Sequence, residues 1–168
     1  MIEKEKIGCD LDGVIATNHL NIVDYRPYRL HEYYSNAKPT GFHIRIPPDI
    51  IITGRRIHYN KLTSGWLANN GIGYEKLIMF PNKEKKSNKS IAEFKAKYIN
   101  DYGLIAYYED DERITELLKD LCPNTKIHHV REVRPHTDED GKSYIVFVVK
   151  HISNDMTEHD YVSLYIPR

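Results

Sequence analysis

The chain has little of what marks secreted proteins, membrane proteins and proteins that coat nucleic acids. Its 168 residues include two cysteines, Cys9 and Cys122, too few for a disulfide scaffold and typical of a reduced cytoplasmic protein. No apolar run approaches the roughly 18 residues of a membrane-spanning helix, and residues 1–6 are charged. The 24 basic and 24 acidic residues cancel, so no positive field favours a long nucleic acid. We expect a cytoplasmic protein that binds neither a membrane nor a long polynucleotide.

Pattern and composition favour one domain of the α/β class. With 40% hydrophobic and 29% charged residues, a chain of this length can bury a real core. Apolar runs typical of buried strands occupy residues 5–9, 49–52, 76–80, 104–108 and 126–130. Helical patterns follow at residues 57–69, 88–102 and 112–121. Strands that alternate with helices predict crossover connections and a parallel sheet.

Two segments fall outside this alternation. Residues 15–46 have no clean period and are rich in Tyr, Arg, Asn, His and Pro, so we interpret them as an insertion. Residues 136–168 carry a turn signal and then β-prone runs at 143–150 and 160–166. We expect these runs to add antiparallel strands to the sheet edge or to form a small separate sheet. The predicted organisation is a core over residues 1–135 and a β extension of the same domain.

The most informative residues are two carboxylates and a glycine, Asp10, Asp12 and Gly13, at the end of the first apolar run. Side chains two apart on a strand point the same way, so the carboxylates of Asp10 and Asp12 can meet. At that spacing they repel each other unless a cation or a shared proton joins them. This favours a nucleophilic carboxylate beside a proton donor, with a divalent metal between them. The alternative is a simple Asp-Gly turn.

A second signal follows the next apolar run, in the segment Ile52-Thr53-Gly54-Arg55. A hydroxyl followed by glycine leaves backbone N–H groups free to hold phosphate oxygens. Arg55 could add a bidentate phosphate contact. We therefore expect Thr53, Gly54 and Arg55 to bind a phosphate, although Thr53 could instead cap the next helix.

Lys95 is the third signal. On a helical wheel it falls inside an apolar stripe, whereas Lys97 falls well away from it; the stripe consists of Ile91, Phe94, Tyr98 and Ile99. A buried cation needs a partner, and carboxylates at the strand ends would supply one. The alternative is a lysine at the edge of the stripe whose ammonium reaches water.

Three consecutive acids, Glu109, Asp110 and Asp111, follow the fourth apolar run. Carboxylate oxygens suit a hard cation, and the same acids can cap the helix that follows them. Asp10, Thr53 and Asp110 each lie just past a predicted strand, at the edge where parallel sheets bind ligands. The sequence therefore predicts one site at this edge.

Taken together and in this order, the segments resemble the haloacid dehalogenase (HAD) superfamily of phosphohydrolases, over about residues 5–130. The resemblance covers the four motifs of that superfamily: Asp10-Leu11-Asp12-Gly13-Val14, Ile52-Thr53-Gly54-Arg55, Lys95 and Glu109-Asp110-Asp111. It is similar in particular to small bacterial and phage members, and it implies a three-layer, Rossmann-like α/β/α fold with a small cap in the insertion.

The resemblance also implies a mechanism. Asp10 would attack a phosphoryl group and become an aspartyl phosphate. Asp12 would protonate the leaving oxygen and then activate the water that hydrolyses the intermediate. Thr53 and Lys95 would hold the phosphoryl oxygens, and the backbone around Gly13 would line the same site. The expected activity is that of a phosphatase.

Mg²⁺ is the cofactor that the resemblance implies. Its ligands would be Asp10, the backbone carbonyl of Asp12 and an acid of the fourth motif. Among these acids we favour Asp110, with Asp111 next, while Glu109 would lie behind the metal ligands.

The insertion offers a hint about the substrate. Its tyrosines and arginines could stack bases and hold phosphates, or the tyrosines could fill a small core; they are Tyr25, Tyr28, Tyr33, Tyr34, Arg26 and Arg29. A small cap leaves an open site, which suits a large substrate or a cap from a second copy of the chain. We expect a nucleotidase or a phosphatase of nucleic-acid ends. The alternatives are a sugar phosphate or other small-molecule phosphatase, and a catalytically weak relative that binds a protein through its tail.

Overall fold

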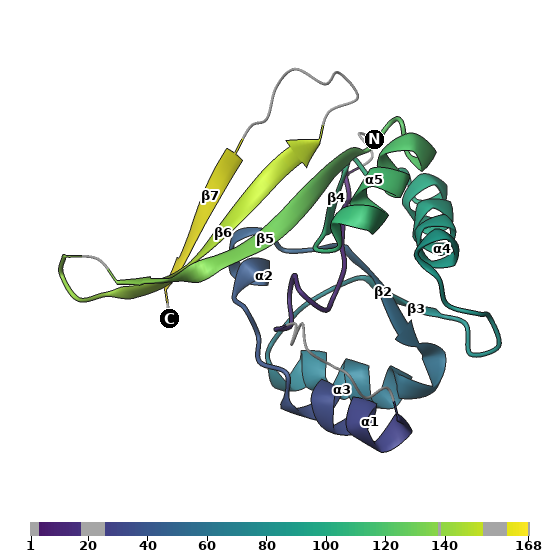
Figure 1. The fold of residues 1–168 in the computed structure, drawn as a ribbon, viewed down its shortest axis with the longest axis horizontal. Helices are drawn as coiled ribbons and strands as arrows, with labels where there is room; N and C mark the ends of the chain where they lie inside the picture. Colours follow the sequence, from purple (N-terminus) through teal and green to yellow (C-terminus); the bar gives the residue numbers. More distant parts are fainter. Residues whose placement is uncertain (1–3, 18–25, 138, 153–160, 168) are drawn as a thin grey trace.

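One seven-stranded sheet is the centre of the computed structural model, which describes residues 4–17, 26–137, 139–152 and 161–167 (Figure 1). Its strands are β1 (Ile7–Cys9), β2 (Ile50–Arg56), β3 (Lys76–Phe80), β4 (Ala106–Glu109), β5 (Lys126–Thr137), β6 (Ser143–Ile152) and β7 (Tyr161–Pro167). They lie in the order β3-β2-β1-β4-β5-β6-β7. Strands β1 to β5 pair in parallel, which confirms the predicted parallel sheet.

Helices cover both faces of the parallel strands (Figure 1). They are α1 (Pro27–Asn36), α2 (Phe42–Arg45), α3 (Asn60–Asn69), α4 (Asn88–Asp101) and α5 (Glu112–Leu121), with a 3-10 turn η1 (Ile57–Tyr59) before α3. Successive residues of β2 alternate between the two faces, as strand geometry requires. Ile50 and Ile52 pack with α4 and α5, whereas Ile51 packs with α2 and α3. The fold is therefore the expected three-layer, Rossmann-like α/β architecture.

The order of the strands marks the place where a ligand would bind. From β1 the chain passes to β2 and β3 on one side, and it then returns to β4 on the other side of β1. In open α/β sheets, ligands bind in the crevice outside the carboxyl ends of the strands where the order reverses. The segment that follows β1 carries Asp10 and Asp12, so both residues lie at this point.

Local sequence signals explain the helix ends nearest to this edge. The Ser87 side chain accepts the Ser90 N–H, and the Ser90 side chain accepts the Ser87 N–H, which forms a reciprocal capping box at the start of α4. Asp111 caps α5 by accepting the Arg113 N–H. Gly103 has a positive φ of 58° just after α4, where glycine is the favoured residue.

The described part of the insertion packs beside α3. Its helix α1 contacts α3 and η1, and the rings of Tyr34 and Tyr59 lie 5.1 Å apart at a near-perpendicular angle. The Thr40 hydroxyl donates to the Val14 carbonyl, which ties the far end of the insertion to the segment after β1. Tyr34 is buried while Tyr28 is 51% exposed, so only part of the tyrosine set fills a core. Tyr25 lies outside the described residues.

Three strands are longer than predicted: β2, β5 and, by two residues, β6. β2 runs to Arg56, so Thr53, Gly54 and Arg55 lie within the strand and not after it. The reason is that β3 continues to pair with β2 across a register shift between Thr53 and Arg56. β5 extends to Thr137 because β6 pairs with it. β6 and β7 add antiparallel strands to the sheet edge, the first of the two arrangements considered above.

Neither cysteine forms a disulfide. Cys9 and Cys122 are both buried, and burial raises the pKa of each thiol, so both act as small apolar residues of the core. In the described part of the chain, no helix has the length and apolar character needed to cross a membrane.

Candidate active site

Acidic residues from two neighbouring strands meet at the carboxyl edge of the sheet. Asp10 directly follows β1, and its N–H donates to the Tyr108 carbonyl of β4 over 2.8 Å. Glu109 is the last residue of β4, and Asp110 follows it. Carboxylate oxygens of Asp10, Glu109 and Asp110 lie within 4.8 Å of one another. Because β1 and β4 are paired in parallel, their ends bring these acids together.

Lys95 reaches this acid cluster from α4. It lies on the helix face that packs on the sheet, among Ala92, Ala96 and Ile99, and only 1% of it is exposed. Its Nζ lies 2.8 Å from Asp10 Oδ2 and 2.5 Å from Glu109 Oε2. The helical wheel thus predicts its burial correctly, and Lys97, two residues on, is exposed.

The charges in the acid cluster do not balance. Burial raises the pKa of Asp10 well above its usual range, and the Lys95 charge offsets this only in part. Burial raises the pKa of Glu109 as well. Burial alone would lower the pKa of Lys95, but the charges of Asp10 and Glu109 outweigh it and raise that pKa. The acid cluster therefore contains three acids, and Lys95 forms ion pairs with two of them.

This imbalance suits a cation. Two unit charges about 4 Å apart interact by roughly 4 kcal/mol at an effective dielectric constant near 20, so three ionised acids strongly oppose one another. Protonation or a bound cation would relieve that repulsion. The ligand atoms are all carboxylate oxygens, which suit a hard divalent ion. Asp10, Glu109 and Asp110 could therefore hold a metal ion.

Gly13 explains how Asp110 comes so close to the segment after β1. Gly13 has a positive φ of 81°, and a Cβ at this position would collide with the Asp110 carboxylate. On the other side, His129 Nε2 of β5 lies 3.0 Å from the Asp110 carbonyl oxygen. Gly54, in contrast, has a normal φ and room for a Cβ, which would only touch Ile91. Only the first of the two glycines is required by a close approach.

The Arg55 guanidinium has a different partner from the one expected. We expected its guanidinium to contact a phosphate, but Nη2 and Nε donate to the two carboxylate oxygens of Asp12, over 2.6 and 2.9 Å. Its Nη1 lies 3.3 Å from the Thr63 hydroxyl of α3, and the guanidinium stacks 3.9 Å above the Tyr34 ring of α1. The side chain is fully buried. Arg55 therefore orients Asp12 and is not presented to a ligand.

Thr53 lies beside this ion pair. It is 1% exposed, and its hydroxyl oxygen accepts the Arg55 N–H over 3.1 Å. A hydroxyl that accepts one hydrogen bond can still donate its proton to an oxygen of a ligand. The position thus fits the predicted phosphate contact, and the helix-capping alternative does not apply, because η1 and α3 have no side-chain cap.

Asp111 does not join the acid cluster. Its carboxylate caps α5 and forms an ion pair with Arg113, with Oδ2 and Nη2 3.0 Å apart. We favoured Asp110 and then Asp111 as metal ligands, and Glu109 replaces Asp111 in the cluster. The helix starts at Glu112, so the residue before it turns outward to cap the helix, whereas Glu109 still lies in the strand.

Reasoning from the sequence missed Thr63 and His129, and it considered Tyr34 only as a base-stacking or core residue of the insertion. Tyr34 and Thr63 contact Arg55, and His129 contacts the backbone of Asp110. None carries a local signal, because each acts through a partner more than seven residues away in the chain. Such contacts depend on the packing of the insertion and of β5.

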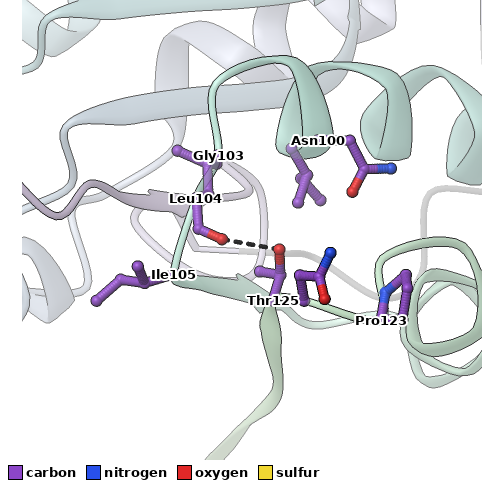
Figure 2. Close-up of a pocket in the computed structure, with 8 residues that line it drawn as sticks. Asn100, Gly103, Leu104, Ile105, Pro123 and Thr125 are labelled. Atoms are coloured by element: carbon purple, nitrogen blue, oxygen red, sulfur yellow. Dashed lines mark hydrogen bonds between the residues drawn. The ribbon is translucent and has the colours of Figure 1, made fainter.

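A cavity of about 410 Å³ lies at the opposite edge of the sheet (Figure 2). It is lined by the end of α4 and by the residues before β4 and β5, including Asn100, Gly103 and Pro123. The Thr125 hydroxyl donates to the Leu104 carbonyl beside it. This cavity is separate from the acid cluster, which lies past the carboxyl ends of β1 and β4.

Comparison with known proteins adds a likeness in fold. No family model matches the chain, and no curated protein matches it. A chain in the structure of the Pnkp1/Rnl/Hen1 RNA repair complex matches 73% of this chain at 18% identity, with a TM-score of 0.55. A chain in another structure of the Pnkp1/Rnl/Hen1 complex matches 68% at 20% identity, with a TM-score of 0.51. This chain spans 41% and 42% of those two chains.

A third structure is that of glycinamide ribonucleotide transformylase 1 from Symbiobacterium toebii. It matches 97% of this chain and 73% of its own length, at 14% identity and a TM-score of 0.47.

Proposed function

We propose that this protein is a metal-dependent phosphohydrolase of the haloacid dehalogenase superfamily that forms an aspartyl phosphate on Asp10. The observation that carries the proposal is the meeting of Asp10, Lys95 and Asp110 at the carboxyl edge of β1 and β4. The four motif segments of the resemblance lie far apart in the sequence. A nucleophilic carboxylate beside a buried lysine and an acid cluster is the arrangement that such a reaction needs.

In the first step, a carboxylate oxygen of Asp10 attacks the phosphorus atom, and the ester P–O bond breaks. Asp12 gives its proton to the leaving oxygen. In the second step, Asp12 takes a proton from water, the water oxygen attacks the phosphorus, and inorganic phosphate leaves. Asp10 is then restored, and Asp12 carries a proton for the next cycle.

The surrounding residues support these steps. Lys95 places a positive charge 2.8 Å from Asp10 Oδ2, which favours the charged nucleophile and would offset the charge of a bound phosphoryl group. Thr53 can donate its hydroxyl proton to a phosphoryl oxygen. Arg55 fixes the orientation of Asp12 through two hydrogen bonds.

A divalent ion is part of the proposal. Asp10 and Asp110, with Glu109 beside them, would hold Mg²⁺, and the close approach of Gly13 to Asp110 fits such a site. When bound, the ion would neutralise the acid cluster and polarise the phosphoryl oxygens.

The proposed substrate is the phosphate of a nucleotide or a nucleic-acid end. Two structural neighbours come from an RNA repair complex, which supports this choice over other phosphomonoesters. On α1 the exposed ring of Tyr28 has the guanidinium of Arg26 at 4.9 Å and that of Arg29 at 5.5 Å. Aromatic rings flanked by arginines can stack bases and contact phosphates.

The experiment is a phosphate-release assay with Mg²⁺ on nucleoside monophosphates, oligonucleotides with a 3′- or 5′-phosphate, sugar phosphates and p-nitrophenyl phosphate. We expect release from nucleotides or oligonucleotide ends that stops when the metal is chelated. Release from sugar phosphates alone would contradict the proposed substrate class and leave the proposed phosphatase reaction in place. If a folded protein releases phosphate from none of these substrates, the proposed enzymatic activity is wrong, and a role in binding another protein is favoured.

A further inference from the structure

A groove of about 640 Å³ lies between α1 and α3. Its lining comes from α1, from η1 and from one face of α3, and Figure 1 shows the two helices side by side. Ligand sites in proteins usually have volumes of about 300 to 1,000 Å³. The groove is therefore large enough for a small ligand or for one part of a larger ligand.

Two buried aromatic rings, Tyr59 and Trp66, form the floor of the groove. The Trp66 Nε1–H donates to the Ala37 carbonyl over 2.8 Å. The Tyr59 hydroxyl donates to the Pro27 carbonyl over 3.4 Å. Pro27 begins α1 and Ala37 directly follows it, so the insertion fixes both rings. Because their hydrogen-bonding groups are already used, the floor offers a ligand only ring atoms.

Polar side chains form the rim of the groove. The exposed residues that line it are all polar, and none of the described lining residues is acidic: His31, Ser35, His58, Lys61 and Asn69. Lys61 supplies N–H donors, and the Asn69 amide can both donate and accept. The Asn82 amide oxygen accepts the His58 Nδ1–H over 3.0 Å, so Nε2 of the neutral ring can accept a hydrogen bond. The rim therefore suits an anionic ligand whose edge carries both donors and acceptors.

Gly65 leaves the middle of the groove open. A Cβ at this position on α3 would meet nothing within 4 Å, and the backbone has no positive φ that would require glycine. Glycine in the interior of a helix is less favourable than alanine. Gly65 therefore weakens α3, and what it provides is space inside the groove.

The groove lies close to the candidate active site. η1 directly follows β2, so it begins at the carboxyl edge of the sheet where Asp10 and Asp12 lie. The rings of Tyr59 and Tyr34 pack together, with 5.1 Å between their centres. The Arg55 guanidinium, which binds Asp12, lies 3.9 Å above the Tyr34 ring. One aromatic ring therefore stands between the floor of the groove and the ion pair of Arg55 with Asp12.

Aromatic and basic groups continue from the groove along α1. Tyr28, His31 and Ser35 are three and four residues apart, so they share one face of the helix. The exposed Tyr28 ring has the guanidinium groups of Arg26 and Arg29 at 4.9 and 5.5 Å. Proteins bind single-stranded nucleic acid through aromatic rings on which bases stack, beside positive groups that meet the phosphates. The groove and this face of α1 have both kinds of group.

We infer that the groove between α1 and α3 binds a nucleobase of the substrate, next to the site that takes its terminal phosphate. The base lies against the rings of Tyr59 and Trp66, and its polar edge meets the rim. Lys61 contacts the phosphate that adjoins this base. The link to the substrate rests on the proposed function, whereas binding of a base to the groove requires no reaction.

Trp66 gives a direct signal for the groove, because it is the single tryptophan of the chain. A short oligodeoxyadenylate is titrated into the native protein without metal, and an abasic strand of the same length is the control. The oligodeoxyadenylate should change the Trp66 fluorescence in a saturable way, and the abasic strand should bind at least about tenfold more weakly. No change with the oligodeoxyadenylate, or equal binding of the two strands, would overturn the inference.

Gly65→Met fills the groove, and Ala68→Met is its matched control at an exposed position of α3 that does not line the groove. Methionine is a good helix former, so circular dichroism should show native helix content in both variants. Gly65→Met should weaken binding of a dye-labelled oligodeoxyadenylate about tenfold or more, measured by anisotropy, and Ala68→Met should change it by less than about twofold. Equal affinities of the two variants would overturn the inference.

The same variants separate this inference from the proposed function. With Mg²⁺, Gly65→Met should raise KM for a phosphate-ended oligodeoxyadenylate about tenfold more than KM for p-nitrophenyl phosphate, which has no nucleobase. If the native protein binds the strand in the groove but releases no phosphate, the proposed reaction fails and the base site stands. If phosphate is released but both KM values change alike, the reaction stands and the inference about the groove fails.

Discussion

Two buried cations hold the two aspartates that follow β1, and one comes from a helix while the other comes from a strand of the sheet. Lys95 projects from α4 and contacts Asp10. Arg55 lies against Thr63 of α3 and contacts Asp12. The two ion pairs are alike in burial of the cation, but their surroundings differ.

The difference is one of charge balance. Lys95 is shared between Asp10 and Glu109, and Asp110 adds a third acid, so negative charge is in excess. Arg55 meets a single carboxylate with two hydrogen bonds, so that pair is balanced. An excess of negative charge suits a bound cation, whereas a balanced bidentate pair fixes the orientation of a side chain. The structure therefore separates a cluster with excess negative charge at Asp10 from a balanced ion pair at Asp12.

The largest effect is expected when the nucleophile is removed. Asp10→Asn should lower turnover by at least about 10³-fold, because the amide cannot form the aspartyl phosphate. Thermal unfolding should show a protein at least as stable as the native one, since the change relieves repulsion in the acid cluster. Near-native turnover by this variant would rule out Asp10 as the nucleophile.

The Lys95 side of the comparison is tested by Lys95→Met, with Lys97→Met as its matched control on the same helix. Loss of the buried cation removes the counter-charge of Asp10 and Glu109 and should cost about 3 kcal/mol of unfolding free energy and about 100-fold in kcat. Lys97 forms an exposed pair with Asp101, so its loss should cost less than about 0.5 kcal/mol. Equal losses in both variants would contradict the proposed role of Lys95.

The acids after β4 are compared by Asp110→Asn and Asp111→Asn. Asp110→Asn should raise the Mg²⁺ concentration that half-activates the enzyme by more than about tenfold, because it removes an oxygen of the acid cluster. Asp111→Asn keeps a residue that can cap α5, so its metal dependence should stay native. A native metal dependence in Asp110→Asn would exclude Asp110 as a ligand.

The ion pair between Arg55 and Asp12 is tested by Arg55→Lys, which keeps the positive charge but loses the two parallel hydrogen bonds. We expect kcat to fall about tenfold for an alkyl phosphate, whose leaving oxygen needs a proton, and less for p-nitrophenyl phosphate. KM should change little, since the side chain is buried away from a ligand. The same loss for both substrates would argue against a role in orienting Asp12.

The smallest expected effect is on stability as a function of pH. Burial raises the pKa of Asp10 and Glu109 in the folded protein. At pH values above about 4, the usual pKa of a carboxyl group, the folded state therefore binds more protons than the unfolded state. Without metal, the contribution of these two acids to the free energy of unfolding should therefore increase as pH falls from 7 towards 5. Chemical denaturation should show a weaker trend for Asp10→Asn, and a trend of the same size would contradict the charge excess.

Much of the fold could be predicted because its pattern is local. Continuous apolar runs that alternate with helical patterns predict β3 and α5 with the observed bounds, and they predict a parallel sheet. Lys95 could be assigned because an apolar stripe fixes which way a helical residue points. The antiparallel tail followed from a turn signal and the two β-prone runs after it, although its place in the sheet was open.

The errors have a common physical cause. Arg55 carries the right chemistry for a phosphate, but its actual partner, Asp12, is fixed by how β2 lies beside β1. Glu109, Asp110 and Asp111 are equally acidic, and only the change from strand to helix decides which of them turn into the site. Such choices depend on tertiary contacts that residue type alone does not reveal.

The most direct test of the account is to look for the phosphoryl group on Asp10 itself. The native protein, turning over p-nitrophenyl phosphate with Mg²⁺, is quenched in acid, and its peptides are analysed by mass spectrometry. The account predicts the mass of one phosphoryl group on the peptide that contains Asp10, and none in Asp10→Asn. Turnover with Asp10 unmodified and the phosphoryl group found on another residue would contradict it.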